Sequence, residues 1–176
     1  RAEIGTIPSG AANCPRPAAV PAGTWITGGD WDHTLWGGEL PEASWIDAVT
    51  PDHPVFLNRL DGHMSLANSA AMKAAGITAA TKEVEGGTIV RDQKGQPTGV
   101  FKDNAAGLIY AIMPPVSEPM RDRALAMAMD FVAAKGVTSV HHMGSWEELA
   151  TFRKAQKNKT LKTRIYANVP LSTWAS

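Results

Sequence analysis

Cysteine is almost absent from this sequence. Cys14 is the single cysteine among 176 residues, so the chain can form neither an internal disulfide nor a CxxC metal clip. A chain of this length buries enough apolar surface to fold without such crosslinks. The scarcity of cysteine therefore leaves the redox compartment open and indicates an ordinary packed core.

Net charge and long apolar runs are also missing. The 17 Lys and Arg residues balance 17 Asp and Glu residues, and no basic stripe is present that would follow a phosphate backbone. No apolar run approaches the roughly 20 residues that cross a bilayer, and the N-terminus lacks the charged-then-apolar order of a signal peptide. These absences argue against nucleic acid and membrane as partners and leave the localisation unknown.

Changes in composition and in residue patterning divide the sequence into three parts. Residues 1–22 are rich in Ala, Pro and Gly without a helical or strand period, which predicts an irregular arm. Residues 23–115 mix short strand and helix patterns, so we expect an α+β lobe there. Residues 116–176 alternate helix and strand patterns, which predicts βα units.

Three elements stand out in the lobe. Pro54–Leu60 has an uninterrupted apolar run between turn signals, which predicts a buried strand. Ser65–Ala75 is rich in Ala and is followed by glycine, which predicts a helix. Thr88–Arg91 and Thr98–Phe101 alternate like the arms of a hairpin.

The last third of the chain predicts two helix–strand pairs. A helix is expected over Ser117–Lys135, with apolar side chains at helical spacing that would pack inward. A strand follows at Val137–His142, a capping box at Ser145–Glu148 opens a second helix, and Arg164–Val169 predicts a second strand. Short joins between such elements are typical of a parallel sheet. The inward-facing set on the first helix comprises Met120, Ala124, Met127, Met129, Ala128, Phe131 and Val132.

Four long motifs follow one another in a specific order: GTWITGGDWDHTLWGGELP, PVFLNRLDGHMSLANSAAMKAAGIT, GGTIVRDQKGQPTGVFKDNA and KGVTSVHHMG. Their order and spacing resemble amidohydrolase family 3, a metal-dependent group, over roughly residues 22–169. The resemblance implies a (β/α)8 barrel with zinc or another divalent metal at the C-terminal ends of its strands. The metal would polarise the scissile carbonyl and activate water.

Compared with the complete barrel that the resemblance implies, the fold predicted for this chain is a partial (β/α)8 barrel. Val137–His142 and Arg164–Val169 correspond to two barrel strands, and residues 23–115 form an inserted lobe. The family's HxH pair and its later metal ligands have no match in this sequence. We therefore expect an internal fragment that binds no metal by itself and is inactive alone.

His63 is the first candidate site residue, because it follows a strand end and a glycine, in the motif Asp61-Gly62-His63. The motif resembles a substrate-facing loop of the family, with Asp61 and His63 binding substrate and His63 a candidate for catalysis. Asp before Gly is also ordinary tight-turn chemistry, and a histidine there can simply bond its own turn. Both interpretations stay open.

Two further positions carry catalytic or metal-binding potential. His141 and His142 end a predicted strand, so one should face the barrel mouth and the other the helices, and His142 is the candidate for catalysis. Adjacent histidines on a strand cannot both bind one metal. Lys102 invites comparison with the lysine that bridges metals in related hydrolases, and it is the candidate metal ligand.

Tryptophan is concentrated near the start of the lobe. Trp31 and Trp36 are candidates for an aromatic substrate subsite, although clustered Trp is more often the core of a small lobe. The first functional hypothesis is a fragment of a metal-dependent hydrolase of C–N bonds in amides or formamides. The alternative is a non-catalytic module that binds a small amide-like ligand. Exposed sheet edges in such a fragment also predict self-association.

Overall fold

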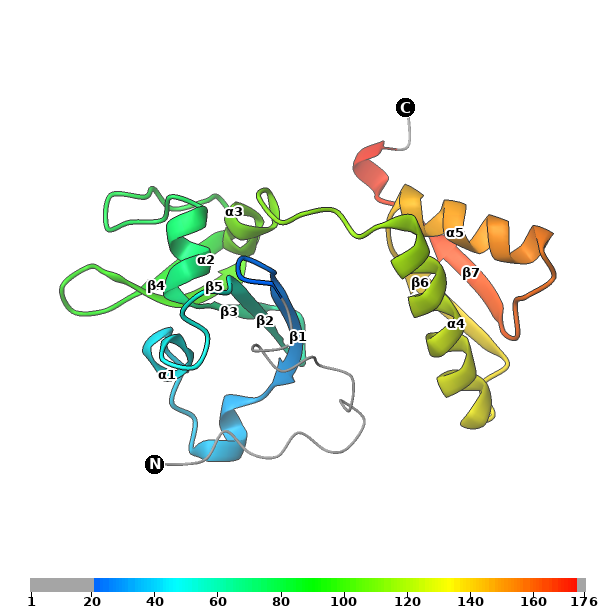
Figure 1. The fold of residues 1–176 in the computed structure, drawn as a ribbon, viewed down its shortest axis with the longest axis horizontal. Helices are drawn as coiled ribbons and strands as arrows, with labels where there is room; N and C mark the ends of the chain where they lie inside the picture. The colour runs from blue at the N-terminus through cyan, green and yellow to red at the C-terminus, as the bar shows by residue number, and fades with distance from the viewer. Residues whose placement is uncertain (1–20, 174–176) are drawn as a thin grey trace. The chain divides into compact units, whose positions relative to one another are not determined.

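The computed structural model describes residues 21–173, and the chain divides into two compact units, unit 1 at residues 1–113 and unit 2 at residues 114–176 (Figure 1). The boundary lies two residues before the one indicated by the sequence. Most of the predicted arm over residues 1–22 lies outside the described residues. The mixed α/β class expected from the sequence is confirmed in both units.

Unit 1 is built on a five-stranded sheet with strand order β1-β2-β3-β5-β4. The first pair is parallel and the other three pairs are antiparallel. The strands are β1 (Ile26–Trp31), β2 (Val55–Arg59), β3 (Met64–Ala67), β4 (Gly87–Arg91) and β5 (Pro97–Asp103). The short helices are η2 (His33–Trp36), α1 (Ser44–Asp47), α2 (Ser69–Ala74), η3 (Asn104–Ala106) and α3 (Gly107–Tyr110).

Both faces of the sheet are buried at its inner strands β2, β3 and β5, because consecutive buried residues on a strand point to opposite faces. Phe56 and Phe101 belong to a core cluster that also contains Ile109 of α3. Their strand neighbours Val55 and Val100 belong to a second cluster with residues from α1. Helices α2 and α3 therefore cover one face and α1 the other (Figure 1).

Local sequence signals located most elements of unit 1, with one error. The strand expected at Pro54–Leu60 and the hairpin at residues 88–101 are confirmed. The helix expected over Ser65–Ala75 is wrong in its first part, which forms β3 and pairs with both β2 and β5. The tertiary pairing overrides the helix propensity of this Ala-rich segment, and the helix begins only after Asn68, its N-cap.

Gly99 shows why β5 needs a glycine. Its φ of +108° is disfavoured for side chains, and an added Cβ would lie 2.6 Å from the Ala67 carbonyl oxygen. The strand can approach both β3 and the α1 region only without a side chain at this position. The close approach lets the Ala43 N–H donate to the Thr98 carbonyl at 2.8 Å.

Unit 2 alternates helix and strand as expected. It contains α4 (Glu118–Ala134), β6 (Ser139–Met143), α5 (Trp146–Lys157), β7 (Arg164–Asn168) and η4 (Leu171–Thr173). Strands β6 and β7 are parallel, with His141 opposite Tyr166. The capping box of Ser145 and Glu148 is confirmed, since each side chain bonds the other residue's backbone N–H. The first strand starts two residues later than the sequence indicated.

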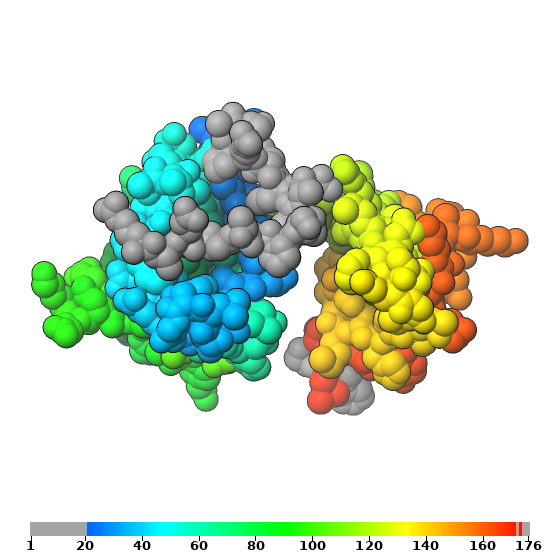
Figure 2. All heavy atoms as spheres, turned by 90° about the horizontal axis from the view of Figure 1, so that it is seen from below, coloured from blue at the N-terminus to red at the C-terminus, as the bar shows by residue number. Residues whose placement is uncertain are grey.

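Helix α4 presents an apolar stripe outward, contrary to the expected inward packing of all its large apolar residues. Met129 is buried, but Met120, Met127 and Phe131 are exposed by 63%, 51% and 66%. Helix α4 lies on the visible surface of unit 2 (Figure 2). The helical spacing identified the helix correctly, and its apolar residues are divided between two faces. No helix in residues 21–173 is both long and apolar enough to span a bilayer.

Candidate functional site

The sheet topology of unit 1 gathers polar residues at one end. Strands β1 and β2 are parallel, so both of their C-terminal ends lie there. Strand β3 is antiparallel to β2 and starts at that end, and β5 is antiparallel to β3 and finishes there. The strand-end cluster defined by this arrangement consists of Asp32, His33, Arg59, Asp61, His63 and Asp103.

Arg59 connects one half of the strand-end cluster. Its Nη2 lies 3.2 Å from Asp32 Oδ1, its Nε donates to His33 Nδ1 at 3.2 Å, and its Nη1 pairs with Asp61. The Arg59 side chain is only 16% exposed, so the ion pairs are shielded from solvent. The Thr34 backbone N–H lowers the pKa of Asp32 and the His63 backbone N–H lowers that of Asp61, with Arg59 adding to both effects.

His63 forms the other half of the cluster with Asp103. Its Nδ1 lies 2.7 Å from Asp103 Oδ1, although the two residues are 40 positions apart. Because a carboxylate only accepts, Nδ1 carries the proton and Nε2 points away from the carboxylate. The side chain is 73% exposed, and Nε2 has no hydrogen-bond partner among residues 21–173. This is a carboxylate-oriented imidazole with one free nitrogen, the arrangement that hydrolases use for proton transfer.

The backbone of Asp103 is strained. Its φ of 47° and ψ of −125° lie in a region that residues with a side chain rarely adopt. The conformation is held by the Asp103 N–H, which donates to the His63 carbonyl at 3.0 Å. Strain of this kind persists where the surrounding structure fixes a residue, and it concentrates at functional sites. The sequence did not identify Asp103 as the partner of His63, because the two residues are 40 positions apart.

Replacing Asp103 by asparagine should return the titration of His63 toward that of an ordinary imidazole. The hydrogen bond and charge of Asp103 raise the pKa of His63, with a smaller contribution from Asp61. The raised folded-state pKa means that the pair stabilises the fold at low pH and loses that effect as pH rises through it. NMR titration of the imidazole protons measures the shift directly. Asp92→Asn, in the β4–β5 turn, should leave it unchanged, and an unaltered titration in Asp103→Asn would contradict the pairing.

The tryptophans of the lobe form an aromatic row beside the cluster. Ring centroids of Trp31 and Trp36 are 6.3 Å apart, and those of Trp36 and Trp45 are 6.1 Å apart. Trp31 also contacts the His33 ring edge-on at 6.1 Å, which joins the row to Arg59 and so to the rest of the cluster. The Trp31 indole N–H donates to the Leu57 carbonyl at 2.8 Å. The rings are therefore fixed in place, and the four residues expected to bind substrate, Asp61, His63, Trp31 and Trp36, belong to one connected network.

The remaining candidates lie apart from this network or contribute nothing visible to it. Lys102 lies on β5 opposite Met64 and Thr88, and no carboxylate of residues 21–173 pairs with it. His142 belongs to unit 2, where its ring packs edge-on against Phe152 of α5, whereas His141 stacks on Tyr166. The expected division of this pair between two faces is confirmed, and His142 is the one that faces the helices.

The described residues do not fit a catalytic metal. Within residues 21–173, no group of three or more His, Cys, Asp or Glu side chains converges as a metal site would require. His63 and Asp103 supply one pair of donors but no third. The side chains of the strand-end cluster can bind and orient a polar group and can exchange protons with it.

The fold of the chain resembles part of the fold of two solved hydrolases. A crystal structure of an uncharacterized metal-dependent hydrolase from Pyrococcus horikoshii superposes with a TM-score of 0.55 at 19% identity, covering 88% of this chain and 29% of that one. A second such hydrolase, from Pyrococcus furiosus, gives 0.54 at 21% identity, covering 88% and 30%. At these identities the likeness concerns the fold alone.

The sequence profile of the amidohydrolase family matches residues 5–173, and the chain belongs to that family. The match starts within the first 22 residues, which the motifs had left outside the resemblance. Protein LONG AFTER FAR-RED 3 of Arabidopsis thaliana is 40% identical, with 87% of this chain and 28% of that protein covered.

Two bacterial relatives have names that refer to amide chemistry. The putative amidohydrolase YtcJ of Bacillus subtilis is 38% identical over 72% of this chain and 24% of its own length. The N-substituted formamide deformylase of Arthrobacter pascens is 35% identical over 69% and 23%. The chain thus spans about a quarter of the length of the relatives it matches.

Proposed function

We propose that this chain is part of a metal-dependent hydrolase of C–N bonds in amides or formamides, and that unit 1 is its substrate-facing lobe. The observation that carries the proposal is the strand-end cluster, in which the DGH motif presents an oriented imidazole beside an aromatic row. The similarity to an enzyme named as a deformylase of N-substituted formamides supports the bond type.

In this proposal, unit 2 contributes two strands of a (β/α)8 barrel. Its parallel pair β6–β7, with α5 as the connection, is the repeating unit of such a barrel. Zinc or another divalent metal would supply Lewis-acid chemistry in the complete enzyme. Its ligands would come from parts of the parent protein that this chain does not contain, so the chain alone would have no hydrolytic activity.

The residues of the strand-end cluster and of the aromatic row would have separate roles in substrate binding. His63 Nε2 is directed away from Asp103 and can donate a hydrogen bond to a substrate carbonyl when the ring is protonated, a state that Asp103 favours. Trp31 and Trp36 offer fixed apolar surface for the nitrogen substituent. Arg59 holds Asp61 in place, and Asp61 in turn orients the His63 backbone through a 3.0 Å hydrogen bond.

N-butylformamide is a suitable probe for this site, because it carries the proposed bond and an apolar substituent. We expect saturable quenching of tryptophan fluorescence and NMR shifts at His63 and Trp31. His63→Gln should weaken binding roughly three- to tenfold, the equivalent of one hydrogen bond, and His141→Gln in unit 2 should have no effect. Absence of saturable shifts at the strand-end cluster would refute the assignment.

The alternative, a non-catalytic binding module, is favoured by one observation, the lack of a three-residue metal group in the described part of the chain. The same titration separates the two proposals. Binding of 2-hexanone, a carbonyl compound without a C–N bond, as tightly as N-butylformamide would favour a general binding module over an amide-specific lobe.

A further inference from the structure

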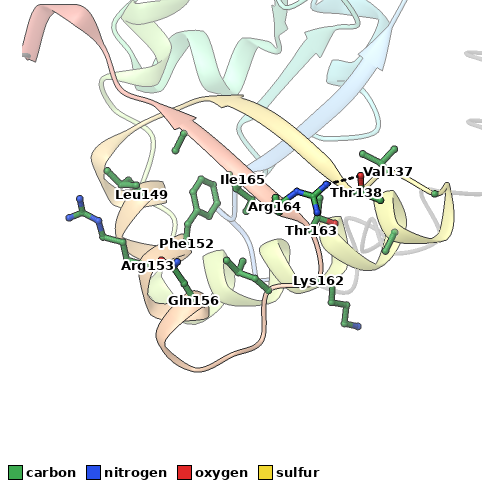
Figure 3. A pocket seen from close by; sticks show the side chains of 14 residues that line it. Val137, Thr138, Leu149, Phe152, Arg153, Gln156, Lys162, Thr163, Arg164 and Ile165 are labelled. Atoms are coloured by element: carbon green, nitrogen blue, oxygen red, sulfur yellow. Dashed lines mark hydrogen bonds between the residues drawn. The ribbon is translucent and has the colours of Figure 1, made fainter.

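Unit 2 contains a cavity that the strand-end cluster does not involve. It has a volume of about 260 Å³ and lies between α4, α5 and the helix-facing side of β6–β7. Its wall is mostly apolar and comprises Leu125, Ala128, Val132, Val140, Phe152 and Ile165. Phe152 and Ile165 also line the neighbouring pocket of about 700 Å³ shown in Figure 3, where Arg153 and Lys162 extend outward at opposite edges.

Three buried side-chain atoms in the described part of the chain have no hydrogen-bond partner, and all three belong to residues that line the smaller cavity. They are Arg121 Nε, His142 Nε2 and Thr163 Oγ1. His142 Nε2 nevertheless lies 3.2 Å from Glu148 Oε2, an ion-pair distance, so Arg121 Nε and Thr163 Oγ1 are the two atoms without any polar partner among the described residues. Thr163 is only 3% exposed. Buried polar atoms are rarely left unpaired, so their concentration at one cavity indicates a polar group that binds there.

Exposure distinguishes the mouth of the cavity from its floor. The side chains of His142 and Glu148 are 33% and 42% exposed, whereas Met129 and Thr163 are nearly inaccessible. The mouth is therefore charged, and the floor is apolar except for the hydroxyl groups of Thr151 and Thr163. The Thr151 hydroxyl already donates to the Glu147 carbonyl at 3.0 Å.

The charges at the mouth compensate one another. Arg121 and Glu148 are the two residues of fixed and opposite charge that line the cavity. No net charge is left to attract an ion, so the mouth favours an uncharged ligand.

We propose that this cavity is a binding site for a small uncharged molecule with an apolar body and one hydroxyl or carbonyl group. The apolar body would fill the space between α4 and α5. Its polar group would accept a hydrogen bond from Arg121 Nε–H at the mouth or bond Thr163 Oγ1 at the floor. The volume is close to the lower end of the range for small-molecule sites.

Benzyl alcohol is a direct probe, because it has this shape and carries no C–N bond, so its binding does not depend on the proposed amide site. We expect saturable NMR shifts of Val140, His142 and Thr163, with none at His63. Benzoate and benzylammonium, which are charged, should bind at least tenfold more weakly. Saturable shifts confined to unit 1, or no saturation up to the solubility limit, would overturn the proposal.

Three substitutions locate the ligand. Ala128→Met should fill the cavity and abolish binding, while Ala126→Met, on an exposed part of α4 outside the cavity, should not. Thr163→Val removes the hydroxyl with little change of shape and should weaken binding roughly three- to tenfold if the ligand bonds it. Equal binding by wild type, Ala128→Met and Ala126→Met would show that the molecule binds elsewhere.

Discussion

Replacing Asn68 by leucine should unfold unit 1. The side chain is 1% exposed, and its Oδ1 accepts from the backbone N–H groups of Val55 at 3.0 Å and Ala71 at 2.9 Å. Its Nδ2 donates to Thr50 Oγ1 at 3.0 Å and to the His53 carbonyl at 2.8 Å. The residue thereby ties β2 and the loop before it to the start of α2.

Leucine has a similar size but can make none of these bonds. Each buried group left unpaired costs about 1–3 kcal/mol, so the sum approaches the roughly 5–15 kcal/mol that stabilises a typical domain. Urea unfolding followed by tryptophan fluorescence measures the loss. Ser69→Ala removes one exposed hydrogen bond, from Ser69 Oγ to Asp47 Oδ2, and should cost about 1 kcal/mol or less. An Asn68→Leu variant that unfolds at the wild-type midpoint would contradict this account of the core.

The elements with strong local signals could be predicted from the sequence. The β4–β5 hairpin has turn residues between alternating arms, and the capping box of α5 lies within four residues. Strand β3 could not be predicted in this way, because SLANSAAMKAA has high helix propensity and only pairing with β2 and β5 makes its first part a strand. The exposed stripe of α4 was misread for a related reason, since helical spacing does not say which apolar face is covered.

The residues of the candidate site could likewise be predicted from the sequence only where a local motif marks them. The motif singled out His63 and Asp61, but its orienting partner Asp103 is 40 residues further along the chain. The pairing of β3 with β5 brings His63 and Asp103 together, and no local sequence pattern encodes that strand order. Arg59 was not singled out from the sequence, because its contacts with Asp32 and His33 depend on β1 lying beside β2.

The second prediction concerns the binding of divalent metal by this chain. The family to which the chain belongs has metal-dependent hydrolases as structural neighbours, yet the described residues bring together no three ligands. A site with two donors, such as His63 and Asp103, leaves half of the positions of a tetrahedral zinc ion to water and binds it weakly. We therefore expect the chain to lose nearly all divalent metal on dialysis and to leave N-butylformamide unhydrolysed.

The most direct test of the claim that the chain holds no catalytic metal by itself is its metal content after dialysis against metal-free buffer. The content is measured by mass spectrometry on chain without a histidine tag. The account predicts far less than one equivalent of zinc, iron, manganese or nickel, both in the wild type and in Asp103→Asn. A full equivalent that survives dialysis, together with release of formate from N-butylformamide, would show that the chain builds a catalytic metal site of its own and would contradict the account.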